Sequence, residues 1–219
     1  MTVFKGKGVY AAVAIGKVSV FKRQAASVRR EKIQDTAKEL ERVEKAKALA
    51  IEQLSAIHEK ALKEVGETNA EIFEIHIMML EDDDYNDSIK SIIETQQVNA
   101  EYAVAVTSDN FADMFTSMED AYMQARAADV KDISNRLIAC LNGSGAAAVS
   151  SDEMMIVCAD DLAPSETVSL DKDKVLAFVT AFGSSNSHTA ILARNMNIPQ
   201  PLPFFLLLVP AVFIMFAEE

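Results

Sequence analysis

The segment that decides the fold of this chain is Val175–Pro199, which reads VLAFVTAFGSSNSHTAILARNMNIP. Its first part, VLAFVTA, is a short apolar run typical of a buried strand, and TAILARNMN is a helix-forming run that Pro199 stops. A Gly/Ser turn and His188 lie between the two runs. The order strand, turn, histidine, helix predicts an α/β domain with His188 at the start of a helix.

A histidine at a helix start can support phosphoryl chemistry. Unpaired backbone N–H groups and the positive end of the dipole can hold an anion there, and a neutral imidazole nitrogen is nucleophilic near pH 7. Ser187 and Thr189 flank His188 with hydroxyls that can bond phosphate oxygens, and this chemistry requires no metal. The alternative is a capped helix start with His188 as an ordinary surface residue, and spacing alone does not decide between the two.

The composition limits the class of protein. A chain of 219 residues, half of them apolar, can bury a core as one large or two small domains. The net charge of -12 argues against a nucleic-acid surface and favours a basic protein partner. Cys140 and Cys158 lack CxxC or zinc spacing, so we expect neither a disulfide framework nor a structural metal site. With no convincing signal-peptide cleavage site, a reduced, cytoplasmic location is expected.

The pattern along the chain changes twice. Val3–Phe21 predicts one or two strands with tight turns around Gly6, Gly8 and Gly16, whereas 29–143 has helical spacing and no proline. The first predicted helix is long, has an apolar stripe from Ile33 to Val65 and ends at Gly66, and the second lies in TNAEIFEIHIMMLEDDD. Three more helices are predicted over Asp87–Gln97, Ala100–Met118 and Ala121–Leu141. Asn86 and Asn99 are the predicted N-caps of the first two of these, and Gly143 is the predicted stop of the last.

Strands return after this helical region. MMIVCA, from Met154, and VLAFVTA are the predicted strands, and the polar loop DDLAPSETVSLD between them has a predicted N-cap at Ser165. The ends of the chain therefore form one α/β domain, split in sequence by an inserted α-helical bundle. The tail, 200–219, is apolar, but Pro203 and Pro210 interrupt it and it is short for a membrane span, so a buried or artefactual tail is expected rather than a transmembrane helix.

The histidine segment resembles the phosphohistidine signature of phosphoenolpyruvate (PEP)-utilising enzymes, Gly-Gly-x-Thr-Ser-His-x-Ala-Ile-x-Ala-Arg-x-x-x-Ile-Pro. The matching residues are Gly183, Ser187, His188, Ala190, Ile191, Ala193, Arg194, Ile198 and Pro199. From Gly8 to Pro199 the chain resembles Enzyme I of the bacterial phosphotransferase system, through GVYAAVAIGK, EIFEIHIMMLEDDD, ARAADVKDISNRL and DDLAPSET.

The resemblance implies domain boundaries and a role for each domain. Residues 1–28 and 144–199 would form the phosphohistidine α/β domain, 29–143 the helical subdomain that binds the carrier protein HPr, and 200–219 an atypical tail. His188 would accept a phosphoryl group from PEP and pass it to HPr in sugar uptake. Thr167 would match a threonine whose hydroxyl lies beside the active imidazole.

The same resemblance implies what this chain leaves to another domain. In the family a C-terminal barrel binds PEP with magnesium and dimerises, and it is absent from these 219 residues. The chain is therefore expected to be a fragment of a PEP-protein phosphotransferase without a cofactor of its own. It would exchange phosphate only with HPr, and no nucleic-acid or membrane partner is expected.

The acidic run EDDD, Glu81–Asp84, ends a predicted helix, where negative charge opposes the dipole. Either Asp84 or a neighbour caps the next helix, or the carboxylates form an acidic rim for a basic carrier. The partner-binding residues that the resemblance implies are Glu67, Met78, Asp82, Asp84 and Arg126. His76 is expected in the core or an interface, since it has no second metal ligand at helical spacing.

Three departures from the family pattern keep other functions open. Ser184 and Asn186 replace a glycine and a threonine in the loop and add bulk where a phosphate must approach, and Ala163 replaces a threonine. A non-catalytic protein-binding helical module with an inactive histidine loop is therefore the alternative function. A further alternative is that the tail prevents the α/β domain from closing, which would leave only the bundle folded.

Overall fold

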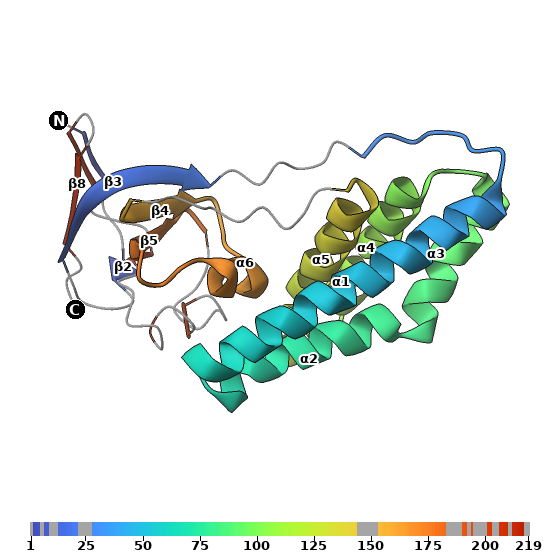
Figure 1. The fold of residues 1–219 in the computed structure, drawn as a ribbon, viewed down its shortest axis with the longest axis horizontal. Coiled ribbons are helices and arrows are strands. Elements are labelled where there is room, and N and C mark those ends of the chain that lie inside the picture. The colour runs from blue at the N-terminus through green and yellow to red at the C-terminus, as the bar shows by residue number, and fades with distance from the viewer. Residues whose placement is uncertain are drawn as a thin grey trace. The chain divides into compact units, whose positions relative to one another are not determined.

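A computed structural model describes residues 2–4, 7–8, 13–21, 28–143, 153–182, 190–191, 194, 201–202, 206–209 and 212–216 (Figure 1). The chain forms two compact units. The α/β unit comprises Met1–Gln24, Glu59–Ala70 and Ala148–Glu219, and the helical unit comprises Ala25–His58 and Glu71–Ala147.

The α/β unit is built on a sheet of six strands. Their order is β1 (Thr2–Phe4), β7 (Leu206–Val209), β8 (Val212–Phe216), β3 (Val13–Phe21), β4 (Met155–Ala159) and β5 (Val175–Thr180). β3, β4 and β5 are parallel neighbours, and β8 runs antiparallel to β3. A second, two-stranded ladder joins β2 (Lys7–Gly8) to β6 (Pro201–Leu202).

The sheet shows how the chain is split. β3 and β4 are adjacent and in register from Lys17 opposite Met155 to Phe21 opposite Ala159, yet the helical unit lies between them in the sequence. Short parallel strands normally need a crossover, and here the inserted bundle is part of that connection. The predicted fold class, an α/β domain split by a helical bundle, is confirmed.

The opening strands differ from the prediction in number and in the role of one glycine. The N-terminal segment forms three strands rather than one or two, and Gly16 lies inside the continuous strand β3 instead of at a turn. A Cβ at Gly16 would collide with the side chain of Leu176 on β5. Any larger residue at this position would require the Leu176 side chain to move, beside the core residues Ala14, Ile156, Ala177 and Val179.

The tail contributes strands β6, β7 and β8. The β7–β8 hairpin pairs Val209 with Val212 and extends the sheet on the side of β3 away from β4, because Phe213–Phe216 lie opposite Val13–Gly16. Across the part of the chain that the structure describes, no helix has both the length and the apolar character needed to cross a membrane.

Helix α6 (Pro164–Ser169) follows β4 after a short connection. Its N-cap residue is Ala163 rather than the predicted Ser165, which is buried inside the helix. The reason is Pro164, whose fixed φ favours the first helical position. The carboxylate of Glu166 accepts a hydrogen bond from the backbone N–H of Ala163 at 2.6 Å and so replaces a capping side chain.

Residues 28–143, the described part of the segment between β3 and β4, contain five helices (Figure 1): α1 (Thr36–Glu64), α2 (Glu67–Glu81), α3 (Asp83–Gln96), α4 (Ala100–Thr116) and α5 (Ala121–Leu141). The predicted stripe on α1 is buried from Val43 to Val65, and Gly66, at φ 83°, ends that helix as predicted. Gly143, at φ 66°, likewise follows the end of α5. α5 has the predicted bounds.

Helix α3 begins four residues earlier than predicted because a different residue caps it. Asp82, not Asn86, is the N-cap, and its carboxylate accepts a hydrogen bond from the backbone N–H of Tyr85 at 3.0 Å. Asn86 lies inside α3, where its amide donates to the carbonyls of Leu80 and Asp82. Asn99 holds the predicted cap position of α4, but its side-chain oxygen accepts from the N–H of Glu31.

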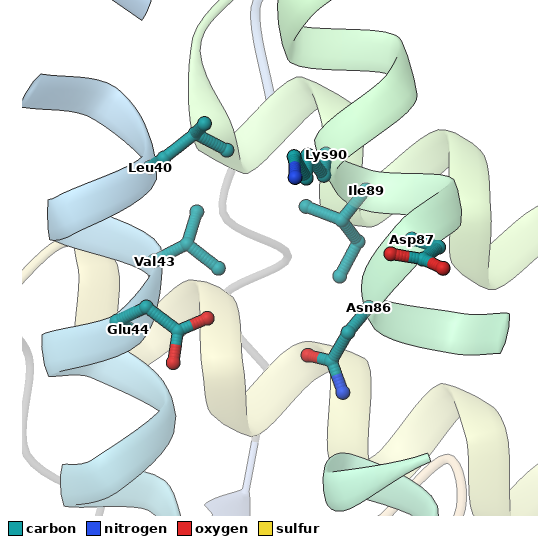
Figure 2. A pocket seen from close by; sticks show the side chains of 7 residues that line it. All are labelled: Leu40, Val43, Glu44, Asn86, Asp87, Ile89 and Lys90. Carbon is teal, nitrogen blue, oxygen red and sulfur yellow. The ribbon is translucent and has the colours of Figure 1, made fainter. Parts of the chain in front are cut away.

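The core of the helical unit combines apolar packing with buried hydrogen bonds, one of them at 2.7 Å between the hydroxyls of Tyr85 and Ser134. The fully buried apolar side chains of this unit include Phe73, Leu80, Ile89, Ile93, Ile133 and Leu137. A groove of about 280 Å³ lies between α1 and α3, where Leu40 and Val43 point toward Ile89 and charged side chains form the rim (Figure 2).

Candidate functional site

The segment that carries His188 follows β5 in the sequence, after the carboxyl end of that strand. β4 ends at Ala159 and β5 at Thr180, and two further backbone hydrogen bonds hold the chain after β5: Ala181 N–H to the carbonyl of Ala159 at 3.0 Å, and Phe182 N–H to that of Asp160 at 2.8 Å. In open α/β sheets, ligands bind at this edge. The chain is thus fixed in place up to the residue before Gly183.

The proposed phosphoryl acceptor and its neighbours in the sequence lie outside the described residues. His188, Ser187 and Thr189 belong to 183–189, and the description resumes at Ala190 and Ile191, which are helical. Ala190 is fully buried. The structure therefore describes the strand before the histidine segment and the first helical residues after it.

Thr167, the predicted neighbour of the active imidazole, is fully buried in α6. Its hydroxyl donates a hydrogen bond to the carbonyl of Ala163 at 3.0 Å. A hydroxyl has one proton and two lone pairs, so Thr167 can still accept a hydrogen bond but has no proton left to donate. This arrangement suits an N–H partner, such as one nitrogen of a neutral imidazole.

The predicted docking residues on α2 and α3 are all exposed. Glu67 is the first residue of α2, and the Met78 side chain is 68% exposed, which is unusual for a large apolar residue. The exposed residues Glu71, Glu74, Met78 and Glu81 recur at intervals of three or four, so Met78 lies on one acidic face of the helix. Asp82 and Asp84 continue the negative charge into the start of α3.

The acidic run at the α2–α3 junction has a structural explanation as well. Its charge opposes the dipole at the end of α2, but Asp82 caps α3 and Asp83 and Asp84 lie in the first turn of α3, where negative charge is favourable. Capping accounts for Asp82. It leaves the exposed carboxylates free to contact a partner.

Arg126 is anchored from two sides. Its Nη1 atom lies 3.0 Å from Oδ2 of Asp129, its guanidinium lies 4.5 Å from the ring centroid of Tyr122, and it also donates to the Tyr122 hydroxyl. The Arg126 side chain is largely buried, at 12% exposure, whereas the Tyr122 side chain is exposed. The guanidinium is therefore held in one orientation between the interior and the surface.

A buried polar cluster behind Arg126 was not predicted. His76 is fully buried, with Nε2 3.4 Å from Oδ1 of Asp129 and Nδ1 3.7 Å from Oδ2 of Asp132. Burial works to raise the pKa of Asp129, but the adjacent His76 and Arg126 side chains outweigh it and the pKa lies below its usual value. Two carboxylates three residues apart within the apolar stripe of α5 are the pattern that could have identified this cluster.

No group of histidine, cysteine and carboxylate side chains in the described ranges is arranged to hold a metal ion. His58, on α1, lies 3.3 Å from Glu74 on α2 and is partly buried. The structure therefore describes three separate features: the exposed acidic face of α2, the anchored Arg126 on α5, and the end of β5 that precedes the histidine segment.

Comparisons with known proteins bear on all three features. Residues 5–126 match the family described as "PEP-utilising enzyme, N-terminal", and residues 151–200 match "PEP-utilising enzyme, mobile domain". The chain is 40% identical over 203 residues to the phosphoenolpyruvate-protein phosphotransferase of Lactococcus lactis subsp. lactis (strain IL1403) and 38% identical over 200 residues to that of Bacillus subtilis (strain 168). These matches cover 92% and 91% of this chain but only 35% of each relative.

Solved structures agree with the sequence matches. An NMR solution structure of Enzyme I superposes with a TM-score of 0.76 at 30% identity, covering 99% of this chain and 93% of that one. A structure described as "N-terminal domain of Enzyme 1 - Nitrogen" matches at a TM-score of 0.66 and 24% identity, over 90% and 82%, and shows the fold alone. By sequence and by fold, the chain belongs to the phosphoenolpyruvate-utilising enzymes and corresponds to the N-terminal region of Enzyme I, the phosphoenolpyruvate-protein phosphotransferase.

Proposed function

We propose that His188 carries a phosphoryl group and exchanges it with the carrier protein HPr. The observation that carries the proposal is the match of 183–199 to the phosphohistidine signature, inside the segment that matches the mobile domain of PEP-utilising enzymes. An imidazole nitrogen of His188 attacks the phosphorus of the donor phosphohistidine. The new N–P bond forms as the old one breaks, and the donor imidazole leaves with its electron pair, so no water or other reactant is consumed.

Thr167 supports the proposed chemistry through its hydrogen-bonding capacity. Because its proton is committed to Ala163, its oxygen acts as an acceptor for one imidazole N–H. Fixing the proton on one nitrogen leaves the other nitrogen with its lone pair free for attack. Ser187 and Thr189 are proposed, from the sequence, to bond oxygens of the phosphoryl group.

HPr is proposed to dock on the exposed acidic surface of α2 and α3. Glu67, Met78, Asp82 and Asp84 supply an exposed methionine among carboxylates, a combination in which charge speeds the encounter and apolar contact slows dissociation. Arg126, held by Asp129 and Tyr122, is proposed to contribute a preorganised cation to the interface with HPr. The net charge of -12 suits a basic partner.

The use of PEP itself is proposed to depend on the remainder of the enzyme. The chain spans about a third of the length of the curated relatives it matches. We assign PEP binding, the expected magnesium ion and dimerisation to the other two-thirds. In this proposal the chain is the cytoplasmic relay between that part and HPr in sugar uptake.

A second candidate function is a protein-binding helical module that no longer transfers phosphate. The departures at Ser184 and Asn186 favour it, because both add side-chain atoms where the signature keeps the loop small. The relay predicts binding of HPr together with transfer, whereas the module predicts binding alone.

Incubation with HPr carrying a ³²P-labelled phosphoryl group separates the two functions. The relay predicts acid-labile label on the chain, present in a His58→Ala control and absent in His188→Ala. Carrier binding without label on the wild-type chain would support the module and overturn the proposed function.

A further inference from the structure

We propose that Thr180 donates a hydrogen bond to the phosphoryl group on His188, which makes it a second phosphoryl-site threonine beside Thr167. The inference rests on the proposed function of His188. It assigns a role to a residue that the signature does not contain, and it begins from a buried hydroxyl that has no partner.

The Thr180 side chain is almost fully buried, at 1% exposure, at the end of β5. Its Oγ1 atom is the one hydroxyl oxygen in the described ranges that is inaccessible to solvent and without a hydrogen-bond partner. Other buried hydroxyls are paired: Thr167 with the Ala163 carbonyl, and Thr107 with Ser88 at 3.1 Å. An unpaired buried hydroxyl costs about 1–3 kcal/mol, so valine would be the more stable residue if packing were its only role.

Thr180 lies at the edge of the sheet where the proposed chemistry takes place. It pairs in register with Ala159, the last residue of β4, and the hydrogen bonds of Ala181 and Phe182 hold the chain that follows. The segment with His188 starts at Gly183, directly after this fixed stretch. The connection from Ala159 to α6, which carries Thr167, leaves from the same edge.

The two threonines have complementary hydrogen-bonding capacity. Thr167 has used its proton and can only accept, whereas Thr180 has its proton available. A phosphoryl group presents acceptor oxygens, so it needs donors, and a neutral imidazole N–H needs an acceptor. Thr167 therefore suits the imidazole and Thr180 suits the phosphoryl group.

The energetic consequence favours the phosphorylated state. The hydrogen bond of Thr180 forms only when a phosphoryl oxygen is present, and a bond to a charged acceptor is stronger than one between neutral groups. The unphosphorylated chain retains the cost of an unpaired hydroxyl. The exchange equilibrium depends on the free-energy difference between the phosphorylated and the unphosphorylated chain. The hydrogen bond of Thr180 lowers the free energy of the phosphorylated chain relative to the other, so it shifts the exchange with HPr toward phosphorylated His188.

The test compares Thr180→Val, Thr180→Ser and the wild-type full chain, with Thr107→Val as a matched loss of a buried hydroxyl in the helical unit. The proteins are equilibrated with fixed amounts of phosphorylated and free HPr, and the phosphorylated fraction is measured. We expect the exchange equilibrium constant of Thr180→Val to fall about tenfold, which is the weight of one charge-assisted hydrogen bond. Thr180→Ser should stay within about twofold of wild type, and Thr107→Val should be unchanged.

A second readout separates this role from a purely structural one. Potassium phosphoramidate phosphorylates imidazoles without a protein partner: its P–N bond breaks, a P–N bond to the imidazole forms, and ammonia leaves. In chains loaded this way, the ³¹P resonance of phosphohistidine should move in Thr180→Val and not in Thr107→Val. Thermal unfolding of unphosphorylated Thr180→Val should be unchanged or raised, because the variant removes an unpaired hydroxyl.

The outcomes distinguish this inference from the function beneath it. Suppose that the wild-type chain is labelled at His188 and that Thr180→Val has the same exchange equilibrium and the same ³¹P resonance. This result would overturn the role of Thr180 alone. A wild-type chain that takes phosphoryl from neither donor overturns the proposed function and this inference together. Labelling by phosphoramidate but not by HPr removes HPr as the partner, and the ³¹P comparison then decides the role of Thr180.

Discussion

In the interior of the helical unit, Nε2 of His76 lies 3.4 Å from Oδ1 of Asp129. This contact joins α2, which carries the acidic face, to α5, which carries Arg126. The other oxygen of the same carboxylate lies 3.0 Å from Nη1 of Arg126, so Asp129 holds both a buried imidazole and a guanidinium that reaches the surface. Asp129 is therefore central to the stability of the helical unit and to the orientation of Arg126.

Replacement of Asp129 by asparagine should destabilise the helical unit. The change keeps the shape of the side chain but removes the charge opposite His76 and Arg126, and loss of one partner in a buried pair costs about 3–5 kcal/mol. Urea unfolding followed by circular dichroism measures the loss. The control is Asp109→Asn, which breaks an exposed ion pair with Lys131 and should change stability by less than about 1 kcal/mol.

The stability difference between wild type and Asp129→Asn should depend on pH. The folded pKa of Asp129 lies below the ordinary 3.8, so its stabilising contribution is present above pH 3.8 and is lost as the pH falls through the folded value. The stability difference between wild type and Asp129→Asn should therefore be constant near neutral pH and shrink in acid. A difference that grows as the pH falls would contradict this assignment.

Substitutions at Asp82 separate its capping role from partner binding. Asp82→Ala removes the acceptor of the Tyr85 N–H and should lower stability by about 1 kcal/mol, whereas Asp82→Asn keeps a capping oxygen and should be closer to wild type. Both variants remove the charge, so both should weaken HPr binding by a similar factor. If affinity followed stability instead of charge, Asp82 would act on the partner only through the helix cap.

Met78 is predicted to contribute to HPr binding without contributing to the stability of the fold. Its side chain is 68% exposed, so Met78→Ala should leave the free energy of unfolding within about 0.5 kcal/mol of wild type. A central apolar contact is worth more than 1 kcal/mol in binding, so HPr affinity should fall about tenfold. Calorimetric titration measures the affinity, with Leu49→Ala, at an exposed position of α1, as the control. Equal affinities for wild type and Met78→Ala would remove Met78 from the interface.

The sequence contains enough information for the helices and the split α/β fold. Spacing of three and four residues predicts the buried stripe of α1, and the bounds of α5 follow from its apolar spacing and Gly143. Short apolar runs predict β4 and β5. These features are local, because each depends on which face of one element avoids water.

The polar contacts could not be predicted, because they depend on which elements meet. Asp82, Asp84 and Asn86 are all residue types that can cap a helix, and the local sequence does not distinguish them. Asp82 is the N-cap of α3 because of where α2 ends. His76 meets Asp129 only after α2 packs against α5. The unpaired hydroxyl of Thr180 likewise becomes apparent only when β5 is placed in the sheet and every possible partner is known.

Tyr85 should make the helical unit sensitive to alkali. Burial raises the pKa of Tyr85 to about 12, so the folded state keeps a proton that the unfolded state begins to lose near pH 10. Stability is therefore fully present below pH 10 and declines as the pH rises toward 12. Tyr85→Phe should be less stable by about 1 kcal/mol at neutral pH, because Ser134 loses its partner, but should lack this decline. The free energies of unfolding of both proteins are measured by urea unfolding at several alkaline pH values. An equal decline in wild type and Tyr85→Phe would contradict this role of Tyr85.

The position of the phosphoryl group tests the account most directly. The chain is incubated with phosphorylated HPr, digested under alkaline conditions that preserve phosphohistidine, and mapped by mass spectrometry. We predict a single phosphorylated peptide, Val175–Arg194 or part of it, with the group on His188 and none in His188→Ala. A phosphoryl group on His58 or His76, or none on the wild-type chain while HPr stays bound, would contradict it.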